Sequence, residues 1–130
     1  MASRIACSVP ALGRRPRCEA TALPSPAVAA ADHAAVRHIL TSPSIAARTA
    51  RYVGHDDFDW NGLLIEAQTM SMGEGVLVRI AYDLWEANGV VASWELARRL
   101  DRRALERVVE AFYIARGELG PGTEALHAAA

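Results

Sequence analysis

From residue 32 onward, apolar positions recur with the 3.6-residue period of an α-helix. Residues 60 to 67 carry apolar side chains at i, i+3, i+4 and i+7, namely Trp60, Leu63, Leu64 and Ala67. A second apolar stripe lies near the end of the chain and consists of Leu105, Val108, Val109 and Phe112. No segment has the pattern of a strand, except possibly Val90 and Val91, and two residues are too short to form one. The pattern predicts an all-α domain.

Capping residues and glycine stops set the bounds of the expected helices. The residues expected to open the helices are Asp32, Ser42 before Pro43, Asp57 and Asp59, Ser71, Ser93 and Asp101. The expected stops are Gly54, Gly89 and Gly117. Residues 71 to 74, Ser-Met-Gly-Glu, also have the capping-box pattern. Together these signals predict five or six helices within residues 32 to 119.

The helix expected from residue 71 to about residue 88 is apolar over most of its circumference. Its polar positions form one stripe, in which Arg79 and Asp83 have the i, i+4 spacing of an ion pair, followed by Glu86. Other helices pack around a helix that is apolar on nearly every side. We therefore expect a compact bundle with this helix at its centre.

The two ends of the chain differ from the middle. Residues 1 to 31 contain four of the six prolines, no aromatic residue, and four arginines against one acidic residue. Such a composition buries too little apolar surface to offset the entropy of ordering, and it predicts a disordered tail. A targeting segment or a misassigned start codon would have the same composition. Residues 120 to 130 are expected to form a frayed C-terminal tail.

Length, charge and cysteine content narrow the class of protein. The 130 residues suit one domain, and the net charge of -1 lacks the strongly basic signature of nucleic-acid binders. No apolar run is long enough to span a bilayer. Cys7 and Cys18 are the two cysteines, so a disulfide framework is not expected. This composition favours a reduced protein of the cytoplasm.

Catalytic, cofactor and metal sites have little support. Residues 55 to 59, His-Asp-Asp-Phe-Asp, could supply His55, Asp56, Asp57 and Asp59 to a cation, but their spacing matches no calcium loop. Acidic residues are also typical of a helix N-terminus, which is the interpretation we favour. The glycines of residues 73 to 75 lack the phosphate-loop spacing, and Ser71 lacks a nucleophile motif. His33 and His38 are expected to face solvent. We predict no catalytic residue, cofactor or metal.

The segment from Trp94 to Arg116 resembles a helix-turn-helix, with a short helix, a tight turn and a longer helix that begins with arginines. In this interpretation Arg102, Arg103 and Arg107 would contact phosphates or bases. Two departures weaken it, because Arg102 and Arg107 stand where that motif usually has apolar residues. Residues 32 to 130 also carry ten arginines and fourteen acidic residues, a net charge of -4 that repels DNA. DNA binding is therefore the alternative hypothesis.

The leading hypothesis is a non-enzymatic helical domain that acts by binding another protein or a second copy of itself. A domain of this size cannot easily bury three Trp and three Tyr residues whole. Trp60 and Trp94 lie near expected helix starts, where a partly exposed indole could anchor a contact. The competing interpretation places all three tryptophans in the core.

Residues 58 to 86 contain Phe-Asp-Trp-x-x-Leu-Leu, then Met-Ser-Met-Gly-Glu, and Leu-Val-Arg-Ile-Ala-Tyr-Asp-Leu-Trp. In these motifs the chain resembles small helical proteins of high-GC actinobacteria, over about half of its length if Arg116 and Gly117 are included. The motifs occupy cap and core positions. The resemblance therefore implies a shared all-helical fold and brings no activity, ligand or catalytic residue with it.

Overall fold

The computed structural model describes residues 26 to 87 and 89 to 119, and within them it confirms the all-α prediction. An isolated antiparallel bridge joins Val53 and Phe58, and the described residues contain no longer strand pairing. The elements are α2 (Pro26–Leu40), α3 (Ala46–Thr49), a 3-10 turn (Ala50–Tyr52), α4 (Trp60–Ala67), α5 (Met72–Glu86), α6 (Ser93–Arg99) and α7 (Arg102–Ala115). None of these helices combines the length and the apolar character needed to cross a membrane.

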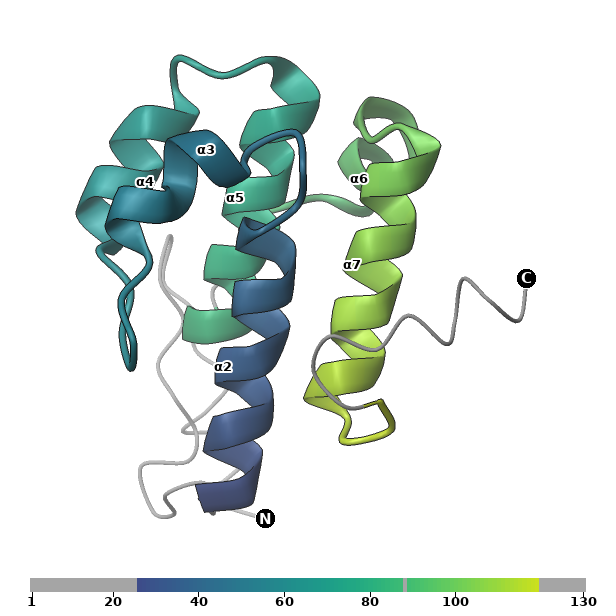
Figure 1. The fold of residues 1–130 in the computed structure, drawn as a ribbon. Coiled ribbons are helices and arrows are strands. Elements are labelled where there is room, and N and C mark those ends of the chain that lie inside the picture. Colours follow the sequence, from purple (N-terminus) through teal and green to yellow (C-terminus); the bar gives the residue numbers. More distant parts are fainter. Residues whose placement is uncertain (1–25, 88, 120–130) are drawn as a thin grey trace, which may run out of the picture.

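Three long helices form the body of the bundle (Figure 1). The α2 helix lies beside both α5 and α7 and runs antiparallel to each, while α4 and α6 pack against α5. These helices enclose one apolar core. Its main contributors are Ala35, Val36, Ile39 and Leu40 of α2, Val76, Leu77, Val78, Ile80 and Ala81 of α5, and Val108, Ala111 and Ile114 of α7. The core is therefore shared by α2, α5 and α7, and α5 also contacts α4 and α6.

The first long helix begins earlier than the sequence predicts. Asp32 is not an N-cap, because α2 starts at Pro26 and Asp32 lies within it. Proline is well suited to the first helical position, and the alanines that follow have the highest helix propensity of any residue. Residues 26 to 31, predicted as tail, are therefore helical. The rest of that predicted tail, residues 1 to 25, and the predicted C-terminal tail, residues 120 to 130, lie outside the described residues.

Several local helix signals act as predicted. The Asp59 carboxylate accepts a hydrogen bond from the Gly62 N–H at 3.0 Å, and the Asp101 carboxylate accepts one from Ala104 at 2.8 Å. Ser71 and Glu74 form the reciprocal capping box at the start of α5. Local sequence is sufficient for these features because each hydrogen bond closes within three residues.

Besides Asp32, two further predicted caps are wrong. Ser42 does not cap α3: its hydroxyl donates back to the Ile39 carbonyl of α2 at 2.6 Å, and α3 begins only at Ala46. Ser93 is the first residue of α6 rather than its cap. The Ala92 N–H at that helix start instead donates to the Glu95 carboxylate at 3.2 Å.

The end of α5 and the loop after it also differ from the prediction. Ala87, not Gly89, is the left-handed residue that ends α5, with φ 57° and ψ 40°. Arg79 does not pair with Asp83. Asp83 accepts hydrogen bonds from the N–H groups of Val90 and Val91 at 2.8 and 2.7 Å and so holds the loop that leads to α6.

Arg79 reaches a partner on another helix. Its guanidinium donates to the Glu95 carboxylate at 2.8 Å, and Arg99 approaches the same carboxylate at 3.2 Å. The hydrogen bond from Arg79, and then the one from the Ala92 N–H, hold the pKa of Glu95 below its usual range. This side chain therefore joins α6 to α5 as a carboxylate.

Candidate functional site

The α7 helix has apolar residues on two faces, and only one of them is buried. Val108, Ala111 and Ile114 are buried against the core, with at most 2% of their surface exposed. The other face carries four large side chains that remain in contact with solvent. They are Leu105, Val109, Phe112 and Tyr113, which are 37%, 38%, 37% and 41% exposed. We call these four residues the outer face of α7.

Helical geometry explains this division. Positions 105 and 112 lie between positions 108 and 109 around the helix, and 108 and 109 are about 100° apart at the two edges of the stripe. The stripe of Leu105, Val108, Val109 and Phe112 is therefore not one surface in the folded domain. Only Val108 of that stripe is buried, because the helices that α7 contacts, α2 and to a lesser extent α5, cover one side of it.

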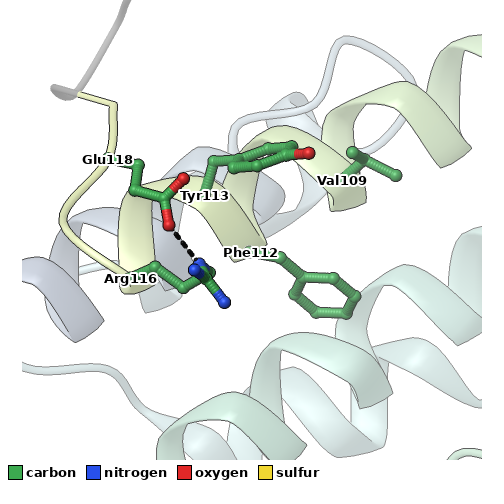
Figure 2. A pocket seen from close by; sticks show the side chains of 5 residues that line it. All are labelled: Val109, Phe112, Tyr113, Arg116 and Glu118. Atoms are coloured by element: carbon green, nitrogen blue, oxygen red, sulfur yellow. Dashed lines mark hydrogen bonds and ion pairs between the residues drawn. The ribbon is translucent and has the colours of Figure 1, made fainter.

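A shallow groove of about 530 Å³ lies along the C-terminal half of this face, lined by Val109, Phe112, Tyr113, Arg116 and Glu118 (Figure 2). The Phe112 side chain projects away from the helix, and the Arg116 guanidinium donates to the Glu118 carboxylate at the far end. Gly117 ends the helix as predicted, in the left-handed region at φ 80°. This turn lets the Glu118 N–H donate to the Tyr113 carbonyl at 2.9 Å. Three apolar or aromatic side chains and one charged pair therefore line the groove.

Polar contacts, of which the His38–Glu110 contact is buried, hold the opposite side of α7 against α2. His38 Nε2 and Glu110 Oε1 lie 2.7 Å apart, with 9% and 1% of the two residues exposed. The prediction that His38 faces solvent is therefore wrong. Arg107 Nε donates to the His38 carbonyl at 2.9 Å, and its terminal nitrogen donates to the Thr41 hydroxyl at 3.0 Å. These bonds satisfy the C-terminal end of α2 and set which face of α7 points outward.

The three arginines predicted to contact nucleic acid have different surroundings. Arg107 is engaged with the end of α2, as described above. Arg102 is exposed and donates to Glu106 at 3.3 Å, an i, i+4 pair along α7. Arg103 is exposed. Of the three, Arg103 is thus the residue whose side chain is committed to no ion pair or hydrogen bond with the described residues.

The two tryptophans predicted as interface residues also differ. Trp60 packs against the core, with ring centroids 5.4 Å from Phe58 and 5.2 Å from Tyr82. Trp94 on α6 is 55% exposed, and the Arg99 guanidinium lies 4.8 Å from its ring centroid. An exposed indole is a usable contact surface, whereas Trp60 contributes mainly to the core.

The acidic cluster before α4 does not form a cation site in the described residues. His55 and Asp56 are fully exposed and 3.8 Å apart, while the Asp59 carboxylate caps α4. Within residues 26 to 87 and 89 to 119, no three His, Cys, Asp or Glu side chains gather as metal ligands would. Within this cluster, Asp59 has a defined structural role, which is to cap α4.

An aromatic cluster surrounds His33 on α2. Its ring lies 4.8 Å from the Phe58 ring and 6.1 Å from that of Trp85, and its Nε2 atom is buried without a hydrogen-bond partner among the described residues. Burial, and then the positive charge of Arg37, lower the pKa of His33. The neutral imidazole is therefore the form that fits this cluster, and His33, like His38, is not the solvent-facing residue that was predicted.

We expect the folded domain to lose stability as the pH falls below about 6.5, the ordinary pKa of histidine. Because the pKa of His33 is lowered on folding, the unfolded chain binds the proton more readily there, and acid favours unfolding. Urea unfolding of the full chain at about pH 7.5 and about pH 5.5 measures this loss. The His33→Phe variant keeps the ring contacts and should show a smaller difference between the two pH values. An equal difference in both proteins would contradict the assignment to His33.

The outer face of α7 is thus the candidate site, and it ends at the Arg116–Glu118 pair. Polar contacts on the opposite side of the helix hold α7 against α2. The sequence does name three of its four apolar residues, as part of a stripe, but gives no sign that they stay exposed. No protein-family model, curated protein or solved structure matches the chain.

Proposed function

We propose that this domain works by binding another protein surface through the outer face of α7. The observation that carries the proposal is the exposure of four large apolar side chains on one side of a single helix, each between 37% and 41%. Gathered exposed apolar surface is costly in water and is typical of binding sites. Trp94 of α6 is also exposed, at 55%, and an exposed indole is a frequent anchor of protein contacts.

A binding role is favoured over catalysis at this face. The side chains that line its groove are three apolar or aromatic residues, with Arg116 and Glu118 paired to each other. Catalytic groups are usually a nucleophile with an adjacent base, or titratable groups held in contrasting environments. The composition of the groove suits apolar contact bordered by charge, which is the usual anatomy of a protein interface.

DNA binding is the weaker alternative. Arg107 would have to release the end of α2 to reach a phosphate, and Arg102 would have to leave Glu106. The N-terminal part of α7 that such a binder would insert into DNA is followed by the apolar side chains of the outer face. Apolar contact with a protein therefore accounts for more of the exposed surface than contact with phosphates does.

Photo-crosslinking in cells that express the full chain tests the proposal. A benzophenone amino acid is placed at Val109 on the outer face, and in a control protein at Ile65, which is 59% exposed on α4. We expect irradiation to give a protein adduct from position 109 and little from position 65. Absence of any adduct from position 109, or equal labelling from both positions, would contradict the proposed function.

Two broader predictions accompany this proposal. The proposed cytoplasmic location rests on cysteine usage, because Cys7 and Cys18 are the two cysteines of the chain. The kinship with small helical proteins of actinobacteria rests on the motifs of residues 58 to 86.

A further inference from the structure

We infer that residues 53 to 58 form an acid-released cover: proton uptake by His33 frees the Phe58 ring, and this segment opens while the helices stay packed. We call residues 53 to 58 the hairpin, because the bridge between Val53 and Phe58 closes them into a narrow loop before α4 (Figure 1). The hairpin contributes no residue to the outer face of α7, so this device is distinct from the proposed protein contact.

The hairpin covers one side of His33. The Phe58 ring centroid lies 4.8 Å from that of the imidazole, and the Trp85 ring of α5 lies 6.1 Å from it. The Nε2 atom of His33 is buried and has no hydrogen-bond partner among the described residues. A neutral imidazole leaves one polar nitrogen unsatisfied there, whereas an imidazolium carries a full charge and an N–H donor on each nitrogen. Charged His33 therefore requires water at Nε2, and the closed cluster keeps that atom buried.

The charges around His33 come from its own helix and from the hairpin, while α5 presents the Trp85 ring. The charged or titratable groups that act on it are Arg37, one turn along α2, and His55, Asp56 and Asp57 of the hairpin. Burial, and then Arg37, lower the pKa of His33, and the two carboxylates oppose this only in part. Once the hairpin opens, water reaches the imidazole and burial no longer disfavours its charge. Proton uptake and opening therefore favour each other.

Few contacts fasten the hairpin to the helices. Phe58 is its one buried residue, with 8% exposed, and the three residues before Phe58 are exposed. Val53 packs against the core from the other strand, and the Arg37 guanidinium donates to the Gly54 carbonyl at 2.6 Å. By contrast, α2 and α5 share the main core. Segments with few buried contacts open before packed helices do, so release of the hairpin is the least costly way to bring water to His33.

Opening uncovers aromatic surface. The Phe58 ring centroid also lies 5.1 Å from that of Trp85 and 5.4 Å from that of Trp60, so its departure exposes parts of both indoles. This surface is covered at neutral pH and becomes available for contact in acid. Histidine suits such a device, because its charge changes between about pH 5 and pH 8.

The direction of the pH dependence follows from the two environments of His33. In the open hairpin its pKa is the ordinary value of about 6.5, and in the closed hairpin it is lower. The open form therefore binds the proton more readily, and opening is favoured as the pH falls below about 6.5. Between about pH 7.5 and pH 5.5 the equilibrium constant for opening should rise by up to about tenfold, the limit reached if the closed form takes up no proton in this range.

Amide hydrogen exchange of the full chain measures this opening. The Gly54 N–H donates to the Asp57 carbonyl at 2.9 Å and the Asp59 N–H to the Tyr52 carbonyl at 2.8 Å, so both amides report on a closed hairpin. Their protection factors, which correct for the intrinsic exchange rate at each pH, should fall several-fold and at most about tenfold from pH 7.5 to pH 5.5. Protection factors that are the same at both pH values overturn the inference.

Low concentrations of urea separate this local opening from unfolding of the whole domain. An opening confined to the hairpin exposes little surface, so the protection of Gly54 and Asp59 should not change with urea, whereas that of buried α5 residues such as Val78 should fall. An equally steep fall for the hairpin amides would mean that His33 takes up its proton through unfolding of the domain, and the inference would be wrong.

Two variants assign the effect to His33. His33→Phe keeps an aromatic ring in the cluster but has no titrating group, so the protection of its hairpin should not depend on pH between these two values. His55→Gln is the matched control, because the His55 side chain is 96% exposed, and it should keep the wild-type dependence. Circular dichroism confirms that both variants are folded. The same pH dependence in His33→Phe as in the wild type, or its loss in His55→Gln, overturns the assignment.

A third variant tests the role of the Phe58 ring while leaving His33 in place. Phe58→Leu gives the imidazole a smaller cover from the hairpin, so His33 should take up its proton at a higher pH. NMR titration of the His33 ring measures the midpoint in both proteins. We expect a midpoint below about 6.5 in the wild type and a shift toward that value in Phe58→Leu. Equal midpoints would show that the hairpin does not control proton uptake by His33, and the inference would fail.

Discussion

Replacing Glu110 with alanine is expected to lower the free energy of unfolding by about 3 to 5 kcal/mol. The Glu110 carboxylate lies 2.7 Å from His38 Nε2 in the interface of α2 and α7, where 1% of Glu110 is exposed. Alanine would leave the polar nitrogen of His38 buried without this partner and would open a cavity at the same place. Urea unfolding of the full chain, followed by circular dichroism, measures the loss.

Two further variants test whether the lost free energy of unfolding comes from the contact between His38 and Glu110. Glu110→Gln keeps the volume and a polar side chain, so it should cost less than Glu110→Ala. Replacing both residues together, His38→Leu with Glu110→Leu, removes both buried polar groups and should recover much of the stability. If Glu110→Ala were as costly in the His38→Leu background as in the wild type, the two side chains would not be coupled and the assignment would be wrong.

The same contact bears on the candidate site. The pair and the Arg107 bonds lie on the side of α7 opposite the outer face, and they set the rotation of α7 about its own axis. If these contacts were weaker, α7 could rotate against α2, and residues of the outer face could become buried in place of Val108 and its neighbours. The buried polar groups thus help to specify which apolar residues of α7 remain exposed, a role that such groups have in some other helical assemblies.

Features of the fold that depend on neighbours in sequence could be predicted from the sequence. The helix class, the capping box of Ser71 and Glu74, and the Gly117 stop each depend on residues within one or two turns. Contacts between distant segments could not. The i, i+4 rule pairs Arg79 with Asp83, but Glu95 lies closer to Arg79 in the fold and Asp83 binds the loop instead. Likewise, the separation of 72 residues gives no sign that His38 meets Glu110.

The candidate site illustrates a second limit of sequence patterns. Periodicity shows which residues of a helix are apolar, but exposure depends on how many other helices surround it. The sequence treats Val108 and Val109 alike, whereas 1% of the first and 38% of the second are exposed. The same limit applies to Trp60 and Trp94, which both lie at helix starts. Of the two, Trp60 packs against the core, whereas the Trp94 indole remains exposed to solvent.

Gly73→Ala is expected to destabilise the domain by about 2 kcal/mol, even though alanine is the better helix former. Gly73 lies in the first turn of α5, where a β-carbon would come within 2.5 Å of the Arg99 carbonyl oxygen at the end of α6. That oxygen belongs to the backbone, so relief of the clash requires α6 and the start of α7 to shift. Thermal and urea unfolding of the full chain measure the loss.

Gly75→Ala in the same helix is the matched control for this prediction. Its β-carbon would lie 3.3 Å from the Ala67 carbonyl oxygen, a contact that a small adjustment relieves. The gain in helix propensity, about 1 kcal/mol, should roughly cancel that cost and leave stability nearly unchanged. The difference between the two variants therefore reports the close approach of α5 and α6 rather than the loss of glycine itself. If Gly73→Ala left stability nearly unchanged as well, α6 would be able to move away from α5 at little cost, and the Arg79–Glu95 contact would not hold it in place.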